Sequence, residues 1–361
     1  MDKKIAILIN KYQENCFTSG GEKVNYFLIQ ALYEIGFDID LYCNETVVEK
    51  SERLKNIYIK QKSEFYKRKN EYLFSMSENF SEKTDFLYIH ENSRAYRENH
   101  TKTILEKILR TIISPKRSKG IQNTLVFQSC IIDEAKKCLC PSTFIQSDLL
   151  ESFDIPLNKT HILPPPIEFD EVADKAVSHK IFTFGLSARG FDNKGGYFVI
   201  LAAMLLKLFN QNFKIVIIYP FSNSAKKFKK VLQILGMGKN IEFIDYCKNM
   251  SDFYDRIDCL IMASKREAFG LVAAEAMHRG IPVIINTQCG IKDFIVNDKN
   301  GFIYDFKRPV LNLFKTMLMV LNQKDNIEQI KTNGAKTIKK LSYENFKAKL
   351  KSIIDDYLTK F

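Results

Sequence analysis

The chain has 361 residues, of which 45% are hydrophobic and 27% are charged. This length accommodates two domains of ordinary size but is short for three, and no stretch reaches the roughly 18 consecutive apolar residues of a membrane-spanning helix. Because the apolar run at residues 5–9 is also far too short for the core of a secretory signal, we expect a cytoplasmic protein.

The net charge is +12, which indicates an anionic partner: nucleic acid, anionic lipid or a phosphorylated substrate. Composition alone does not choose among the three. The eight cysteines are spread through apolar segments at spacings that fit no common zinc motif, so we expect reduced thiols rather than a metal site.

The N-terminal part of the chain alternates between strand and helix patterns. Residues 3–10 are apolar, residues 24–35 carry helical periodicity, and residues 38–43 resume as a strand. This strand–helix–strand order predicts a parallel sheet. Further elements are expected as strands at residues 56–60, 86–90 and 137–140, and as a helix at residues 144–153.

A second series of strands and helices begins after a proline-rich segment. Pro164, Pro165 and Pro166 are stiff and cannot join a sheet ladder, which suits a domain edge. Strands are then expected at residues 181–186, 214–219, 241–244, 259–264, 282–286 and 301–304, and helices at 310–321 and 326–341. The pattern predicts an α/β fold with two Rossmann-like, doubly wound domains.

The expected domain boundaries follow from this pattern. Residues 1–168 form the first domain, residues 169–180 a polar linker, and residues 181–341 the second domain. Residues 342–361 carry a last amphipathic helix, which we expect to return to the first domain.

The most informative segment is residues 265–282, which follows a predicted strand and opens a predicted helix. Glu267 and Glu275 are separated by seven residues, with Phe-Gly after the first glutamate and Gly-Ile-Pro-Val after the second. This spacing, with its flanks and its strand–loop–helix context, resembles the signature of the retaining GT-B glycosyltransferases of family 4. The resemblance implies that Glu267 contacts the donor sugar and Glu275 the ribose of a nucleotide-diphosphate sugar.

The same segment has a physical reason to bind a diphosphate. The backbone amides of Phe269, Gly270 and Leu271 are expected at a helix N-terminus. Unpaired N–H groups and the helix dipole favour an anion there.

Two further loops support donor binding. Gly20 and Gly21 lie between the first strand and the first helix, where glycine lets the backbone approach a phosphate and adopt positive φ. Arg189 and Lys194 follow the first strand of the second domain and resemble the family's two cations, which neutralise the leaving diphosphate. In the family the arginine directly follows a glycine, whereas Leu186 stands at that position here, so Arg189 departs from the pattern.

The resemblance extends to the acceptor side and to most of the chain. His90 and Glu91, just past a predicted strand, look like the family's acceptor-side histidine and its neighbour. Residues 140–142, 162–165 and 288–293 also fit the family. Within family 4, the chain is most similar to lipopolysaccharide-core hexosyltransferases of the heptose glucosyltransferase type.

A basic amphipathic segment lies in the first domain. Apolar residues at helical spacing occupy one face of residues 101–114, and a basic run follows. The cations that would meet anionic lipid are Lys102, Lys107, Arg110, Lys116, Arg117 and Lys119. The same apolar stripe could equally pack on the sheet of the first domain, and both readings stay open.

An Asp-x-Asp sequence at residues 38–40 matches a metal-binding pattern of another glycosyltransferase fold. It lies in a predicted strand directly after the first helix, so we interpret it as an alternating strand. We therefore expect no required metal and no cofactor beyond the donor substrate.

Together these features predict a glycosyltransferase that moves a hexose from a nucleotide-diphosphate sugar, with UDP expected as the nucleotide. The expected acceptor is a glycan or a lipid-linked glycan of bacterial surface-polysaccharide biosynthesis, reached from the inner face of the membrane. The alternatives are a nucleotide-sugar 2-epimerase and a non-catalytic basic protein that binds membrane or polyanions. No nucleic-acid motif is found, and aromatic residues do not cluster with arginines, so we expect no nucleic-acid partner.

Overall fold

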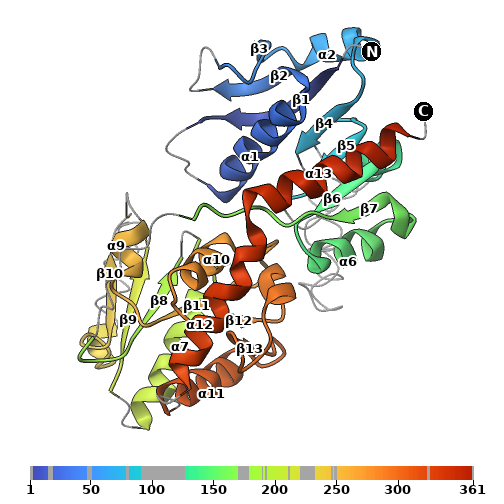
Figure 1. The fold of residues 1–361 in the computed structure, drawn as a ribbon. Helices are drawn as coiled ribbons and strands as arrows, with labels where there is room; N and C mark the ends of the chain where they lie inside the picture. The colour runs from blue at the N-terminus through green and yellow to red at the C-terminus, as the bar shows by residue number, and fades with distance from the viewer. Residues whose placement is uncertain are drawn as a thin grey trace, which may run out of the picture. The chain divides into compact units, whose positions relative to one another are not determined.

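The computed structural model describes residues 3–14, 19–46, 51–78, 81–90, 127–169, 179–188, 190–191, 193–209, 212–219, 232–244, 247, 250–322 and 326–359. The chain divides into two compact units (Figure 1). Unit 1 comprises Met1–Pro166 with Tyr343–Phe361, and unit 2 comprises Ile167–Ser342. Of the predicted linker, residues 170–178 lie outside the described residues.

Unit 1 is built on a seven-stranded sheet of order β3-β2-β1-β4-β5-β6-β7, in which every pairing is parallel. The strands are β1 Lys4–Tyr12, β2 Asp38–Thr46, β3 Asn56–Ile59, β4 Ser75–Glu78, β5 Phe86–Tyr88, β6 Lys137–Cys140 and β7 Thr160–Ile162. Its helices include α1 Gly20–Ile35, α2 Lys62–Arg68, α6 Thr143–Ser152 and α13 Tyr343–Leu358. Short 3-10 turns lie at η1 Lys69–Glu71 and η2 Leu157–Lys159.

Unit 2 contains a six-stranded parallel sheet of order β10-β9-β8-β11-β12-β13. The strands are β8 Thr183–Ser187, β9 Lys214–Ile218, β10 Ile241–Ile244, β11 Cys259–Met262, β12 Val283–Asn286 and β13 Phe302–Tyr304. Its helices include α7 Gly196–Leu208, α9 Met250–Tyr254, α10 Leu271–His278, α11 Pro309–Asn322 and α12 Ile327–Ile338, with η3 Gly290–Phe294 and η4 Lys339–Leu341.

Helices cover both faces of the unit 2 sheet. Successive residues of a strand point to opposite faces, and β9 shows the result: Ile215 and Ile217 belong to one hydrophobic core, whereas Val216 and Ile218 belong to another. The first core includes residues of α7 and α11, and the second includes residues of α9 and α10. A parallel sheet buried on both faces explains why its strands read as continuous apolar runs.

The C-terminal helix returns to unit 1, as the sequence predicted. One face of α13 is buried, and α13 packs against α1. The Tyr357 ring lies 5.0 Å from the Phe86 ring, and Lys347 Nζ lies 2.8 Å from Glu34 Oε2 on α1. The two parallel sheets and the returning helix confirm the predicted α/β class with two Rossmann-like units.

The Asp-x-Asp sequence lies in β2, as predicted. Asp40 is fully buried, and its carboxylate lies 2.9 Å from Lys4 Nζ and accepts hydrogen bonds from Asn56 and Tyr72. Asp38 pairs with Lys55 on the surface. These contacts provide the buried Asp40 carboxylate with partners, so we interpret Asp40 as a structural residue of the sheet.

Within the described ranges, no helix is long and apolar enough to cross a membrane.

Candidate functional site

The predicted donor residues Lys194 and Glu267 lie together in unit 2. Lys194 follows β8 and Glu267 follows β11, so both come from the carboxyl ends of adjacent strands. Lys194 Nζ lies 2.6 Å from Glu267 Oε2, and the same oxygen accepts a hydrogen bond from Ser264 Oγ at 3.0 Å. The two side chains are 37% and 20% exposed, so the pair is accessible to a ligand.

A close approach of two backbone segments fixes the position of Lys194. Gly195, the residue before α7, has a φ of 72°, in the left-handed region. A Cβ on Gly195 would lie 2.0 Å from the Ala263 carbonyl oxygen, and the Lys265 amide donates to the Asn193 carbonyl at 2.8 Å. Only glycine fits here, because both the backbone conformation and the space exclude a side chain.

A second set of backbone hydrogen bonds holds Glu267. Its amide donates to the Gln288 carbonyl at 3.0 Å, and its carbonyl accepts from the Gly290 amide at 2.9 Å. The fully buried Asn286 supports this arrangement, because its amide group donates to the Ser264 carbonyl and accepts from the Gln288 amide. The loop at residues 288–293 is therefore joined to the glutamate segment. Sequence reasoning missed Asn286, which carries no motif of its own.

Helix α10 begins at Leu271, in the segment that also carries Glu267. Gly270 is its N-cap residue with a φ of 111°, and a Cβ there would lie 2.9 Å from Met262 Sδ. The Phe269 side chain is buried in the unit 2 core, so Phe269 can act on a ligand through its backbone alone. Leu271 opens the helix, as the sequence predicted. The first turn of a helix leaves amides without helical acceptors, which favours an anion close to Lys194.

Glu275 lies one turn further along α10 and is held by a tyrosine. Tyr254 Oη donates to Glu275 Oε2 at 2.9 Å, and the Arg279 guanidinium lies over the Tyr254 ring at 5.5 Å. Burial, together with the charge of Glu275, raises the pKa of Tyr254 well above its usual value. The phenol therefore stays protonated and donates to Glu275 throughout the physiological pH range. Tyr254 was not predicted, since its only link to Glu275 is spatial.

In unit 1, Gly20 and Gly21 are the first two residues of α1. Neither has a positive φ, so the expectation that they need the left-handed region is wrong. Ser19 caps the helix, accepting from the Glu22 amide while Glu22 accepts from the Ser19 amide. The atom nearest to a Cβ on Gly21 would be Ser19 Oγ, at 3.9 Å. The space beside Gly21 at the start of α1 is therefore not filled by neighbouring side chains.

His90 follows β5 and is largely buried, with 12% of its side chain exposed. Its Nε2 lies 3.1 Å from Asn25 Oδ1 on α1. Burial lowers the pKa of His90 to about 4, so the ring is neutral at neutral pH.

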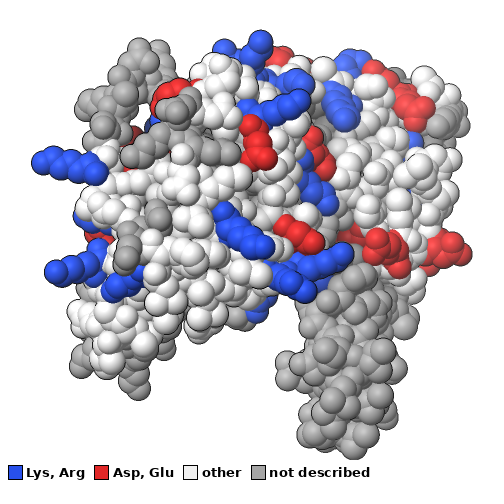
Figure 2. Space-filling model, turned by 90° about the horizontal axis from the view of Figure 1, so that it is seen from below, with Lys and Arg blue, Asp and Glu red and all other residues white. Residues whose placement is uncertain are grey.

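Several predicted residues lie outside the described residues. They are Glu91, Arg189, Lys102, Lys107, Arg110, Lys116, Arg117 and Lys119. Among the described side chains on the face in Figure 2, positive and negative groups are interspersed, and several lysines and arginines stand beside carboxylates. Among the described residues, no group of three or more His, Cys, Asp and Glu side chains is arranged to hold a metal ion.

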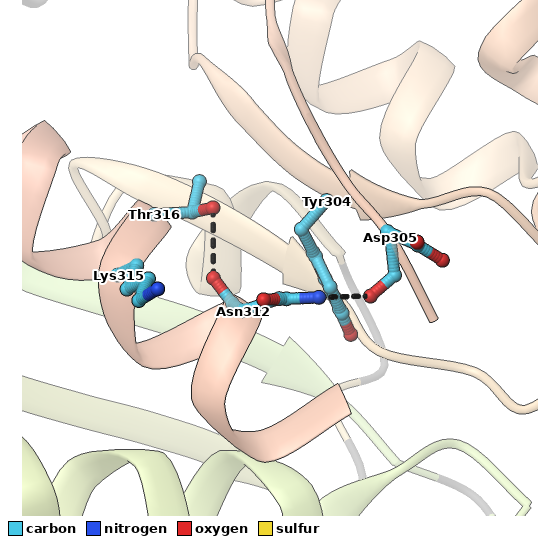
Figure 3. A pocket seen from close by; sticks show the side chains of 5 residues that line it. All are labelled: Tyr304, Asp305, Asn312, Lys315 and Thr316. Carbon is cyan, nitrogen blue, oxygen red and sulfur yellow. Dashed lines mark hydrogen bonds between the residues drawn. The ribbon is translucent and has the colours of Figure 1, made fainter. Parts of the chain in front are cut away.

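A separate surface hollow lies at the end of β13 and the start of α11 (Figure 3). It is lined by Tyr304, Asp305, Asn312, Lys315 and Thr316. Asn312 bridges the two elements by donating to the Asp305 carbonyl at 2.9 Å. The lining includes none of the predicted donor residues, and we assign the hollow no role.

Comparison with known proteins gives the class of this fold. Residues 170–337, nearly all of unit 2, match the family model described as "Glycosyl transferases group 1". The capsular polysaccharide biosynthesis glycosyltransferase CapM of Staphylococcus aureus is 25% identical over 181 residues, which are 49% of this chain and 47% of CapM. The chain thus spans about half the length of the curated relatives it matches.

Two solved structures cover nearly the whole chain. WaaG, a glycosyltransferase involved in lipopolysaccharide biosynthesis, aligns with a TM-score of 0.75 and 16% identity over 97% of this chain and 99% of WaaG. Anabaena HepE in complex with UDP aligns with a TM-score of 0.71 and 13% identity over 98% of this chain and 100% of HepE. The protein has the GT-B fold, and unit 2 is similar to the glycosyl transferases of group 1.

The backbone contact at Gly195 leads to a stability prediction. Gly280→Ala is the matched control, because Gly280 also has a left-handed φ, of 69°, but nothing lies within 4 Å of its Cβ position. Gly280→Ala should therefore lower the free energy of unfolding only by the cost of placing alanine in the left-handed region, about 1–2 kcal/mol. Gly195→Ala should lower the free energy of unfolding by about 1–3 kcal/mol more than Gly280→Ala does, because the Ala263 carbonyl must move. Chemical denaturation of both variants measures this difference, and equal losses would show that the loops are not in tight contact.

Proposed function

We propose that this protein is a retaining glycosyltransferase of family 4 that transfers a hexose from a nucleotide-diphosphate sugar, with UDP as the nucleotide. The observation that carries the proposal is the Lys194–Glu267 pair, 2.6 Å apart, beside the N-terminus of α10. This arrangement places a cation, unpaired amides and hydrogen-bond acceptors within one small region. A sugar joined to a diphosphate needs all three.

The proposed roles follow from the chemistry of each group. Lys194 and the α10 amides neutralise the charge that develops on the diphosphate as its bond to the sugar carbon breaks. Glu267 accepts hydrogen bonds from sugar hydroxyls, and Glu275 accepts them from the ribose. The acceptor oxygen bonds to the sugar carbon, and its proton passes to the departing diphosphate. Retention of configuration comes from the family resemblance.

Metal independence is part of the proposal, because protein groups supply the positive charge that a metal ion would otherwise provide. Lys194 and the helix terminus are two of these groups, and Arg189 is proposed as a third. The donor is therefore the one non-protein component that we propose for the reaction.

The proposed acceptor is a glycan or lipid-linked glycan of bacterial surface polysaccharide, contacted from unit 1 through His90 and Glu91. The similarity to CapM, a glycosyltransferase of capsular polysaccharide biosynthesis, and to WaaG, a glycosyltransferase involved in lipopolysaccharide biosynthesis, supports this class. The basic segment at residues 101–119 is proposed to contact anionic lipid on the cytoplasmic side of the membrane.

Donor binding is tested by thermal stability against UDP-glucose, UDP-galactose, UDP-N-acetylglucosamine and GDP-mannose. A ligand at about 100 times its dissociation constant stabilises the folded state by about 2.7 kcal/mol, so one nucleotide sugar should raise the melting temperature by several degrees. Glu275→Gln should abolish most of this shift. The matched control is Glu242→Gln, which neutralises a 53% exposed carboxylate in the same unit and should keep the shift. No shift with any nucleotide sugar would contradict the proposal.

The hydrogen bond from Tyr254 to Glu275 makes a separate prediction. Tyr254→Phe removes the hydroxyl and keeps the ring under Arg279. A hydrogen bond to a charged group contributes about 1.5–3 kcal/mol, so the dissociation constant for the nucleotide sugar should rise about tenfold or more. Calorimetric titration measures the change, with Tyr197→Phe on an exposed ring of unit 2 as the control. An unchanged affinity would show that Tyr254 does not orient Glu275 for binding.

A further inference from the structure

One oxygen of the Glu267 carboxylate receives hydrogen bonds from two different side chains. Oε2 accepts from Lys194 Nζ at 2.6 Å and from Ser264 Oγ at 3.0 Å. Among the described residues, no donor is bonded to the other oxygen, Oε1, and the carboxylate is 20% exposed. The protein therefore holds one oxygen of Glu267 and leaves the other able to accept from a ligand.

The two donors differ in how easily a ligand can reach them. The Lys194 side chain is 37% exposed, and its ammonium carries three N–H groups on a flexible stem. Ser264 is 1% exposed and has a single O–H on a short side chain. An ionised carboxylate can only accept, so the Ser264 proton is directed to Glu267. A bound anion can thus share the lysine, but it cannot reach the serine hydroxyl.

The fold fixes Ser264 without any help from Lys194. Ser264 lies two residues past the end of β11, and its carbonyl accepts from Asn286 Nδ2 at 2.9 Å. The preceding residue, Ala263, lies against Gly195 in the close backbone contact between the two loops. The hydroxyl of Ser264 is therefore held at one place by buried groups on both sides.

A diphosphate at the start of α10 would draw on the Lys194 charge, so the bond from Lys194 to Glu267 weakens when the donor binds. We propose that Ser264 is a positioning residue that then keeps Glu267 in place, with Oε1 available to a hydroxyl of the donor sugar. Ser264 thus serves recognition of the sugar, whereas Lys194 serves the diphosphate. The inference rests on the proposed function, which assigns the sugar to Glu267 and the diphosphate to Lys194.

Ser264→Ala separates the two parts of the donor. Calorimetric titration measures the dissociation constants of the best-binding of UDP-glucose, UDP-galactose, UDP-N-acetylglucosamine and GDP-mannose, and of its bare diphosphate, UDP or GDP. Ser264→Ala should weaken the nucleotide sugar about tenfold, because Glu267 loses the bond that orients it, and should change the bare diphosphate by less than about twofold. An equal loss for both ligands, or no loss for either, would overturn the proposal.

The matched control removes a buried hydroxyl at the other end of the same sheet. Thr183 is 4% exposed at the start of β8, and its Oγ1 donates to the Ile181 carbonyl at 2.9 Å. Thr183→Val should leave the ratio of the two dissociation constants unchanged. A ratio that shifts as much as in Ser264→Ala would show that the effect is not specific to Ser264.

Two more variants test whether Ser264 acts through Glu267. Ser264→Cys keeps nearly the same size but offers only a weak donor, so it should also weaken the nucleotide sugar selectively, even if Ser264→Ala does not fold. In a Glu267→Ala background there is no carboxylate to hold, so adding Ser264→Ala should cause no further loss. A further loss of the full size would refute the positioning role.

These outcomes separate the role of Ser264 from the proposed function. A wild-type protein that binds no nucleotide sugar would contradict the proposed function, and this inference with it. A wild-type protein that binds one, together with a Ser264→Ala variant that binds it equally well, would contradict the role of Ser264 alone.

Discussion

The position of the Lys194–Glu267 pair in unit 2 depends on one close contact, between the backbone that follows β8 and the backbone that follows β11. Gly195 allows this contact, and the contact places Lys194 within 2.6 Å of Glu267. A partly exposed ion pair contributes little to stability on its own. The ion pair matters because it positions both side chains: without a ligand, each charge holds the other in place. An anion that binds beside α10 then meets the Lys194 cation already in position.

The same logic of fixed partners applies to the other polar groups. Glu275 is held by a phenol that stays protonated, and Glu267 is held by backbone bonds on both sides and by Ser264. Groups whose orientation is set by the protein need little reorganisation when charge develops on a substrate, which is the condition for electrostatic catalysis.

The sequence predicted the parts of this site that lie in one stretch of chain. Glu267, Gly270 and Glu275 lie at a characteristic spacing within one loop and the helix that follows it, and Lys194 follows a predicted strand. The local sequence pattern was therefore enough to predict them. The structure added Tyr254 and Asn286, whose roles arise from contacts across the fold. Strand β4 was missed because its four residues, Ser-Met-Ser-Glu, are mostly polar although all are buried. Strand β7, Thr-His-Ile, was missed because only one of its three residues is apolar. Gly20 and Gly21 were expected in the loop before the first helix, but they are the first two residues of α1, because the helix is capped by Ser19.

If Lys194 and the start of α10 hold the second phosphate of a nucleotide, as we propose, a diphosphate binds more tightly than the corresponding monophosphate. The dissociation constants of UDP and UMP, with GDP and GMP in parallel, are measured for the wild-type protein and for Lys194→Gln. The preferred diphosphate should bind at least about tenfold more tightly than its monophosphate, and Lys194→Gln should remove most of this preference. Equal binding of diphosphate and monophosphate by the wild-type protein, or an undiminished preference in Lys194→Gln, would contradict it.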